Sequence, residues 1–291
     1  MTRWFNTAGP CQADIHYMVS PTGRLPNLKQ LISQHSYFVI HAPRPTGKTT
    51  AMLALAEELT NSDKPERHAL RDRHTAVMVS AEVGSPFPHD PGAAELAILD
   101  AWWASAKFDL PSDLHPPSLN NEAQPGRRIQ AALQAWAASS KRPLVLFIDE
   151  IDSLQDETLM SVLRQLRDGY RTRPKNFPLS VGLIGLRDVR DYKFASGGSE
   201  TVAGVGFRPS KLLNPKGSRL NTSSPFNIKV SSLTLRNFNS TEVQELYHQH
   251  TEDTGQVFTD QAIDIAFDLT QGQPWLVNAH EDRSCRKYCY R

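Results

Sequence analysis

The sequence predicts an α/β protein with a parallel sheet covered by helices on both faces and a small helical lid at its C-terminal end. Three observations lead to this prediction. Short apolar runs alternate with amphipathic stretches through most of the chain, which is typical of consecutive βαβ units. The run Pro143–Ile148 is apolar throughout, as expected of a central strand buried on both sides. The last stretch before the C-terminus shows only helical spacing.

Apolar runs with few helix formers mark the strands. We expect them at Tyr37–His41, Thr75–Val83, Pro143–Ile148 and Leu179–Leu186, with a weakly alternating fifth at Asn227–Leu235. The weak alternation of the fifth indicates a strand at the edge of the sheet. Helical spacing of apolar residues marks Leu28–Ile32, Thr49–Leu59, Ala93–Phe108, Arg127–Ser140, Thr158–Tyr170, Ser240–Thr254 and Thr259–Thr270. In the last two helices a Ser or Thr stands where it can cap the N-terminus.

The composition is that of an ordinary globular protein. The 291 residues suffice for one large α/β domain and a small second unit. A formal net charge of +1 gives no global signal for nucleic acid or membranes, although a local basic groove stays open. No run approaches the roughly 18 apolar residues that a membrane span needs. Three cysteines without a signal peptide favour a cytoplasmic protein without a disulfide framework.

The segment Ala42–Thr49 follows a predicted strand and opens a predicted helix, which is the context of a phosphate-binding loop. Backbone N–H groups and the helix N-terminus can wrap the phosphates of a nucleotide. Gly47 allows close approach, Lys48 supplies an ammonium, and the Thr49 hydroxyl can coordinate magnesium. The residues expected to contact the nucleotide are Ala42, Pro43, Arg44, Pro45, Thr46, Gly47, Lys48, Thr49 and Thr50.

This loop departs from the common pattern. Ala42 replaces the first glycine, and Pro43 and Pro45 remove two N–H donors, which we expect to weaken affinity. The alternative interpretation is an ordinary turn that contains Gly-Lys-Thr by chance.

Two adjacent carboxylates, Asp149 and Glu150, follow the third strand at the edge where ligands of α/β proteins lie. We expect Asp149 to hold a magnesium-bound water and Glu150 to polarise the attacking water. A surface Asp-Glu pair is the alternative. Arg187, after the fourth strand, could stabilise developing charge or form a salt bridge to Asp149 or Asp188. Asp152 and Asp156 are expected to be charges at helix starts.

Four segments in order, APRPTGKTT, LVLFIDEID, LIGLRDV and GQPWLVN, resemble the AAA-like ATPases of the P-loop NTPase superfamily, close to the STAND group of AAA+ proteins. The resemblance covers roughly 17–278 and implies a three-layer P-loop core with a helical lid. It places Arg187 at the sensor 1 position and Pro274 in a G-x-P motif near the nucleotide. It also places Tyr17–Arg24 around the adenine. The alternative is that Gly272–Pro274 only end one helix and begin the next.

The resemblance also suggests a division of the chain. We expect an adenine-side segment over 1–35, an ATPase core over 36–235, and a lid with a polar tail over 236–291. The stretch 195–224, rich in Gly, Ser and Asn, is expected to be a mobile insertion. Because such proteins usually continue into further domains, the chain could be a truncated member.

The function expected from these residues is ATP binding with magnesium, with slow hydrolysis that drives a conformational switch. Two alternatives stay open. One is a nucleotide-binding scaffold that does not hydrolyse ATP, and the other is a DNA-associated ATPase. A protein partner or self-association is also compatible with the sequence.

Overall fold

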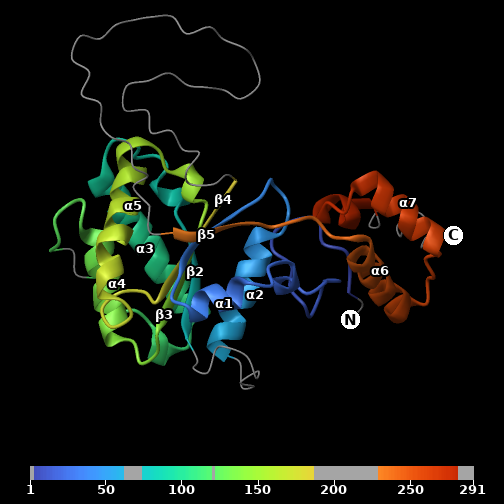
Figure 1. Cartoon of the computed structure of the whole chain (residues 1–291), viewed down its shortest axis with the longest axis horizontal. Coiled ribbons are helices and arrows are strands. Elements are labelled where there is room, and N and C mark those ends of the chain that lie inside the picture. Colours follow the sequence, from blue (N-terminus) through green and yellow to red (C-terminus); the bar gives the residue numbers. More distant parts are fainter. Residues whose placement is uncertain (1–2, 62–73, 120–121, 187–228, 281–291) are drawn as a thin grey trace, which may run out of the picture.

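A computed structural model describes residues 3–61, 74–119, 122–186 and 229–280. Figure 1 shows an α/β core on the left and a helical lid on the right, joined by the chain that follows β5. The predicted insertion at 195–224, Arg187 and the polar tail after His280 lie outside the described residues. No described helix is both long and apolar enough to cross a bilayer.

The sheet has five strands, all paired in parallel. They are β1 (Tyr37–His41), β2 (Thr75–Ser80), β3 (Leu144–Asp149), β4 (Ser180–Gly185) and β5 (Lys229–Thr234). Their spatial order is β2-β3-β4-β1-β5, so the fifth strand lies at an edge as predicted. Because all strands point the same way, the ends of β3, β4 and β1 meet side by side at one edge of the sheet.

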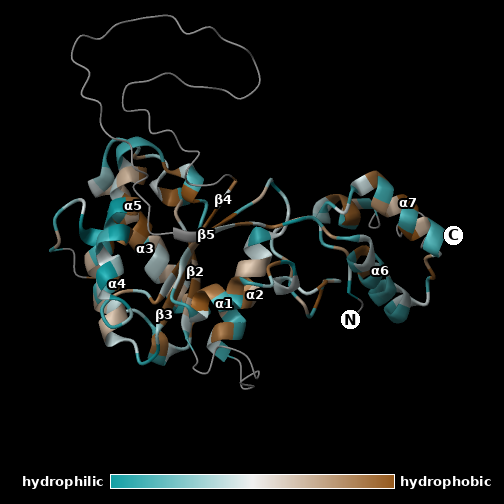
Figure 2. Ribbon diagram, in the orientation of Figure 1, coloured by the Kyte–Doolittle hydropathy of each residue, from teal (hydrophilic) through white to brown (hydrophobic). Residues whose placement is uncertain are grey.

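Helices cover both faces, which confirms the three-layer fold class. Beyond α1 (Leu28–Ser33) and α2 (Lys48–Asn61), the core contains α3 (Pro91–Asp109), α4 (Arg128–Ser139) and α5 (Asp156–Gly169). Short 3-10 turns occur at Thr22–Arg24, Glu82–Gly84, Ser112–Leu114, Ile151–Ser153 and Tyr170–Thr172. In Figure 2 strand β4 is brown, and its residues are buried like those of β3 between two helical layers, whereas the edge strand β5 is pale.

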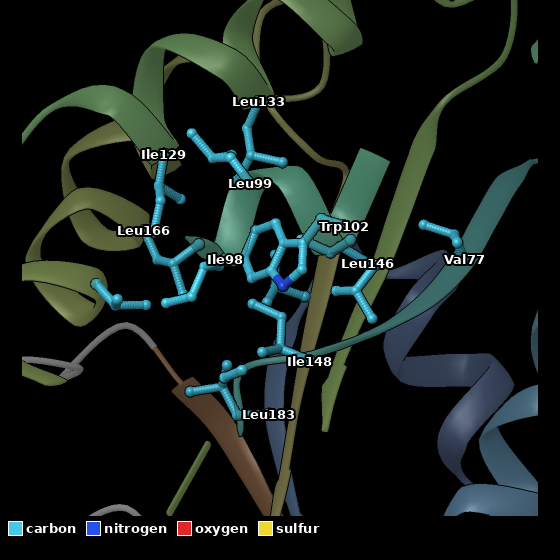
Figure 3. Close-up of a cluster of buried hydrophobic side chains, with 14 of the residues drawn as sticks. Val77, Ile98, Leu99, Trp102, Ile129, Leu133, Leu146, Ile148, Leu166 and Leu183 are labelled. Carbon is cyan, nitrogen blue, oxygen red and sulfur yellow. The ribbon is translucent and has the colours of Figure 1, made fainter. Parts of the chain in front are cut away.

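Alternate side chains of each strand enter different layers of the core. On β3, Leu146 and Ile148 pack toward α3, α4 and α5, whereas Val145 and Phe147 pack toward α1 and α2. Figure 3 shows Trp102 of α3 at the centre of the first layer, close to Leu146 and Ile148. The Trp102 indole is fully buried, and its Nε1 donates to the Ser80 carbonyl at 2.8 Å. The packing of these side chains holds in place the edge of the sheet on which the candidate site lies.

The second strand is shorter than the sequence predicts. β2 ends at Ser80, and Glu82–Gly84 form a 3-10 turn instead of completing the predicted strand to Val83. The Ser80 hydroxyl accepts a hydrogen bond from the Glu82 N–H at 3.1 Å. Such local side-chain hydrogen bonds compete with the backbone hydrogen bonds between strands. The apolar pattern of the sequence did not reveal this bond, so the predicted strand was too long.

The helical lid comprises α6 (Ser240–Thr254), α7 (Asp260–Thr270) and a helical stretch at 274–280. Thr259 caps α7 as predicted, but the cap of α6 is Asn239, which forms a capping box with Glu242. The prediction of a Ser or Thr cap for α6 was therefore wrong. Phe5, Tyr17 and Val19 of the N-terminal segment join the lid helices in one buried cluster.

Candidate nucleotide-binding site

The predicted phosphate-binding loop connects β1 to the start of α2. The buried Ala42 donates its N–H to the Gly185 carbonyl of β4 at 3.3 Å, which anchors the loop to the sheet. The Thr46 hydroxyl donates to the Pro43 carbonyl at 3.0 Å across the loop. Gly47 has a φ of +84°, a conformation that side chains other than glycine rarely adopt. The loop therefore has a defined shape that depends on Gly47.

Lys48 opens α2 and turns its side chain back over the loop. Its Nζ donates to the Ala42 carbonyl at 2.7 Å and to the Pro43 carbonyl at 3.3 Å. Burial lowers the pKa of Lys48, while the nearby Asp149 and Glu150 carboxylates oppose that shift. The ammonium is thus held in a buried position beside the loop.

Thr49 and Asp149 meet although 100 residues separate them in the sequence. The Thr49 hydroxyl donates to Asp149 Oδ2 at 2.9 Å, and Asp149 Oδ1 accepts the Glu150 N–H at 2.9 Å. Asp149 is the last residue of β3 and is only 6% exposed. A hydroxyl and a carboxylate at the N-terminus of a helix are hard oxygen donors of the kind that magnesium prefers, so these residues fit that ion.

Glu150 follows Asp149 in a left-handed backbone conformation, with a φ of +54°. Its Oε2 forms an ion pair with Nη2 of Arg44, which lies in the predicted phosphate-binding loop. Burial raises the pKa of Glu150, and the Arg44 guanidinium partly offsets that shift. The loop and the two carboxylates are therefore in direct contact.

Asp152 also reaches this edge of the sheet. It lies in the turn after Glu150, where its Oδ2 accepts the Leu186 N–H at 3.3 Å. A Cβ on Gly185 would come within 2.9 Å of Asp152 Oδ1. Asp152 lies in the first turn of a short helix, as predicted, and in addition its side chain contacts the end of β4. Arg187 follows directly but lies outside the described residues.

Arg24 is a central residue that the sequence did not single out, apart from its place in the segment expected around the adenine. Its Nη1 donates to the Thr46 carbonyl of the loop and to the Arg236 carbonyl after β5, both at 2.9 Å. Its guanidinium also lies over the Phe238 ring, 4.9 Å from the centroid. Burial lowers the pKa of Arg24 to about 10, so it remains charged at neutral pH. Arg24 thus joins the predicted phosphate-binding loop to the chain that enters the lid.

The G-x-P segment of the lid contacts the loop directly. Gln273 Nε2 donates to the Pro45 carbonyl at 2.8 Å, and Pro274 is buried beside it in the chain. Gly272 has a φ of +65°, and a Cβ there would come within 2.0 Å of the Phe238 carbonyl oxygen. Only glycine fits there. The segment ends α7 and begins the helical stretch 274–280, as the alternative interpretation expects, and a place for Pro274 near the nucleotide stays a prediction. Gln273 was missed because its contact depends on a tertiary approach across 228 residues.

The N-terminal segment completes the surroundings of the loop. The Cys11 N–H donates to the Thr50 hydroxyl at 3.1 Å, and Trp275 Nε1 donates to the Thr7 carbonyl at 2.8 Å. One segment therefore contacts both the start of α2 and the lid.

Solved structures share this fold at low identity. The Walker-type ATPase PABY2304 of Pyrococcus abyssi is 12% identical, with a TM-score of 0.54 over 94% of this chain and 69% of its own. ORC1 of Aeropyrum pernix, solved in complex with DNA, is also 12% identical, with a TM-score of 0.50 over 93% of this chain and 62% of its own. The chain thus spans between 62% and 69% of these proteins. At such identities the likeness concerns the fold alone.

A match of the sequence to a family profile identifies the family. No curated protein matches the chain. The profile described as an AAA domain matches residues 31–192, more than half of the chain, and includes the predicted phosphate-binding loop and both carboxylates. The finer grouping with STAND proteins stays a prediction. The chain belongs to the AAA domain family.

Proposed function

We propose that the chain binds ATP with magnesium at the loop 42–50 and hydrolyses it slowly to switch the position of its helical lid. The observation that carries this proposal is the 2.9 Å contact between Thr49 Oγ1 and Asp149 Oδ2. It joins the two segments that a P-loop enzyme needs side by side, one for phosphate and one for metal and water. Membership of the AAA domain family supports the same conclusion.

The proposal gives each residue of the site a role in ATP binding or hydrolysis. Loop N–H groups and Lys48 would hold the β- and γ-phosphates, and Thr49 and Asp149 would hold magnesium. Magnesium, when bound, would neutralise charge on the phosphate oxygens. Glu150 takes a proton from water while the water oxygen bonds to the γ-phosphorus, and the bond to ADP breaks with its electron pair leaving on ADP. Arg187 is proposed to stabilise the charge that develops, and Pro274 to lie near the nucleotide.

The switch is supported by the contacts between loop and lid. Gln273 reaches the Pro45 carbonyl, and Arg24 joins the Thr46 carbonyl to the chain entering the lid. Any change of the loop on nucleotide binding alters these contacts. The lid can therefore respond to the state of the nucleotide.

Replacement of Lys48 tests the proposal. Lys48→Ala should reduce ATP affinity or turnover at least about tenfold, equivalent to about 1.4 kcal/mol. Calorimetric titration and phosphate release, each with and without magnesium, provide the measurements. The matched control is Lys29→Ala, which removes a lysine paired with Glu58 on the surface. If Lys48→Ala and Lys29→Ala both behave as the parent does, the loop is not a phosphate site.

The non-hydrolysing scaffold is distinguished in the same experiment. It is favoured by Pro43 and Pro45, which lack N–H donors for phosphate. Tight ATP binding by the parent without phosphate release above background would make the scaffold the better conclusion.

A DNA-associated ATPase has one specific observation in its favour. Arg164, Arg167, Arg171 and Lys175 are all exposed along α5 and the turn after it. No ion pair within the described ranges neutralises them. Such a row can contact phosphates, with affinity that falls steeply as salt rises. Salt-dependent binding of duplex DNA that Arg167→Ala/Arg171→Ala abolishes would support this candidate, and salt-independent or absent binding would exclude it.

A further inference from the structure

The N-terminal segment 3–19 is attached to the lid at both of its ends. Arg3 forms an ion pair with Asp253 of α6 at 3.0 Å. At the other end, Gln249 of α6 accepts the Met18 N–H at 3.2 Å and donates to the Met18 carbonyl at 2.8 Å. Figure 1 shows the segment, in dark blue, between α2 and α6. Both ends of the segment are therefore held by the same lid helix.

The middle of the segment contacts the helical stretch 274–280 of the lid. Asn278 Nδ2 donates to the Asn6 carbonyl at 2.7 Å in a buried hydrogen bond, and Trp275 Nε1 donates to the Thr7 carbonyl at 2.8 Å. Apolar side chains of the segment also pack into the buried cluster of the lid. A displacement of the lid therefore carries the segment with it.

The Asn6 side chain shapes the turn by which the segment reaches the core. Its Oδ1 accepts the Ala8 N–H at 3.1 Å, and its Nδ2 donates to the Gly9 carbonyl at 3.2 Å. After this turn the Cys11 N–H donates to the Thr50 hydroxyl in the first turn of α2, at 3.1 Å. The segment thus connects the lid with the start of the helix that follows the predicted phosphate-binding loop.

We propose that the segment 3–19 is a strap, which moves with the lid and conveys the position of the lid to α2 through the hydrogen bond between Cys11 and Thr50. Thr50 directly follows Thr49, whose hydroxyl contacts Asp149 at 2.9 Å, so a pull on the strap acts beside the proposed magnesium site. The proposal rests on the proposed ATP-dependent switch of the lid. Because coupling between two sites is reciprocal, the strap makes ATP affinity depend on the lid as well as the reverse.

A substitution that loosens the strap outside the predicted site tests this role. Asn6→Ala removes the hydrogen bonds that shape the turn, and Asn6 is a positioning residue here. The variant should weaken ATP affinity about fivefold, equivalent to about 1 kcal/mol, because the lid no longer supports the start of α2. The single-turnover rate at saturating ATP should stay within about twofold of the parent, since no reacting group is changed.

Calorimetric titration and single-turnover hydrolysis give these two values. The matched control is Asn27→Ala, which truncates an exposed asparagine whose side chain does not cap the helix that follows it, and it should match the parent in both. Unchanged ATP affinity in Asn6→Ala would contradict the strap.

Hydrogen exchange separates this coupling from a general loss of stability. At saturating ATP and magnesium, Asn6→Ala should keep the added protection of 42–50 and lose part of the protection of 259–278, whereas general destabilisation would lower both. Loss of protection in both regions, or in neither, counts against the proposal.

The nucleotide-free chain provides a test that does not need ATP. The Cys11 amide, which donates to Thr50, should exchange faster in Trp275→Phe, a change that removes the hydrogen bond to Thr7 but keeps an aromatic ring. Asn27→Ala should leave this exchange as in the parent. If the parent binds no ATP, the proposed function fails, yet the Cys11 exchange still decides whether the lid holds the strap on α2. Equal Cys11 exchange in Trp275→Phe and the parent overturns the strap, and faster exchange supports it.

Discussion

At the scale of single residues, Asp149 and Glu150 have different surroundings although they are neighbours. Asp149 is buried and contacts the Thr49 hydroxyl, whereas Glu150 turns to the loop through Arg44. The sequence could predict that both lie at the sheet edge, because an apolar strand precedes them. It could not predict the partner of Glu150, since Arg44 reaches it only through the tertiary fold.

This difference predicts separate effects of substitution. Glu150→Gln should leave ATP affinity within a few-fold and slow single-turnover hydrolysis about a hundredfold, in the range of a lost general base. Asp149→Asn should also weaken magnesium-dependent binding, because metal coordination acts on the ground state. Glu157→Gln, at the exposed start of α5, serves as the control. Should Glu150→Gln hydrolyse ATP as fast as the parent, Glu150 is not the base.

The pH dependence of hydrolysis follows from the same residue. Burial raises the pKa of Glu150 above that of an ordinary glutamate, and a general base acts only when deprotonated. The rate should therefore fall as the pH drops, beginning at a higher pH than the ordinary glutamate pKa of about 4.3. Single-turnover rates of the ATP-saturated enzyme, measured across the acid pH range, test this expected fall. A rate that stays flat through the acid range would argue against Glu150 as the base.

At the scale of elements, the link between loop and lid depends on a buried arginine. Arg24 donates to carbonyls of the loop and of the chain after β5, positions that are 22 and 212 residues away. The sequence predicted the strand, loop and helix around Lys48 because local patterns encode them. Arg24 and Gln273 escaped prediction because their partners are backbone carbonyls of distant segments.

Arg24→Met keeps much of the side-chain volume and removes the donors. It should lower the free energy of unfolding by about 2–3 kcal/mol, since one buried and one partly buried carbonyl lose a charged donor. Arg3→Met, which breaks the more exposed pair with Asp253, should change it by less than about 1 kcal/mol. Urea unfolding of both variants compares them. Equal losses would mean that Arg24 has no special part in holding these segments together.

At the scale of the whole molecule, the parallel sheet and its helical layers were predictable from the alternation of apolar runs and helices. The division of the chain at about 35 and 235 stays a prediction. Phe5, Tyr17 and Val19 pack into the lid cluster, which favours grouping the N-terminal segment with the lid. That association could not be read from the sequence, because the first residues have no regular pattern that identifies a partner.

Hydrogen exchange over the whole chain, with and without ATP and magnesium, tests the central claim most directly. If ATP binds at the loop and engages the lid, amides in 42–50 and in 259–278 should both become protected. Protection of the loop alone would leave binding intact and contradict the switch. Equal exchange of both regions at saturating ATP and magnesium would contradict the account as a whole.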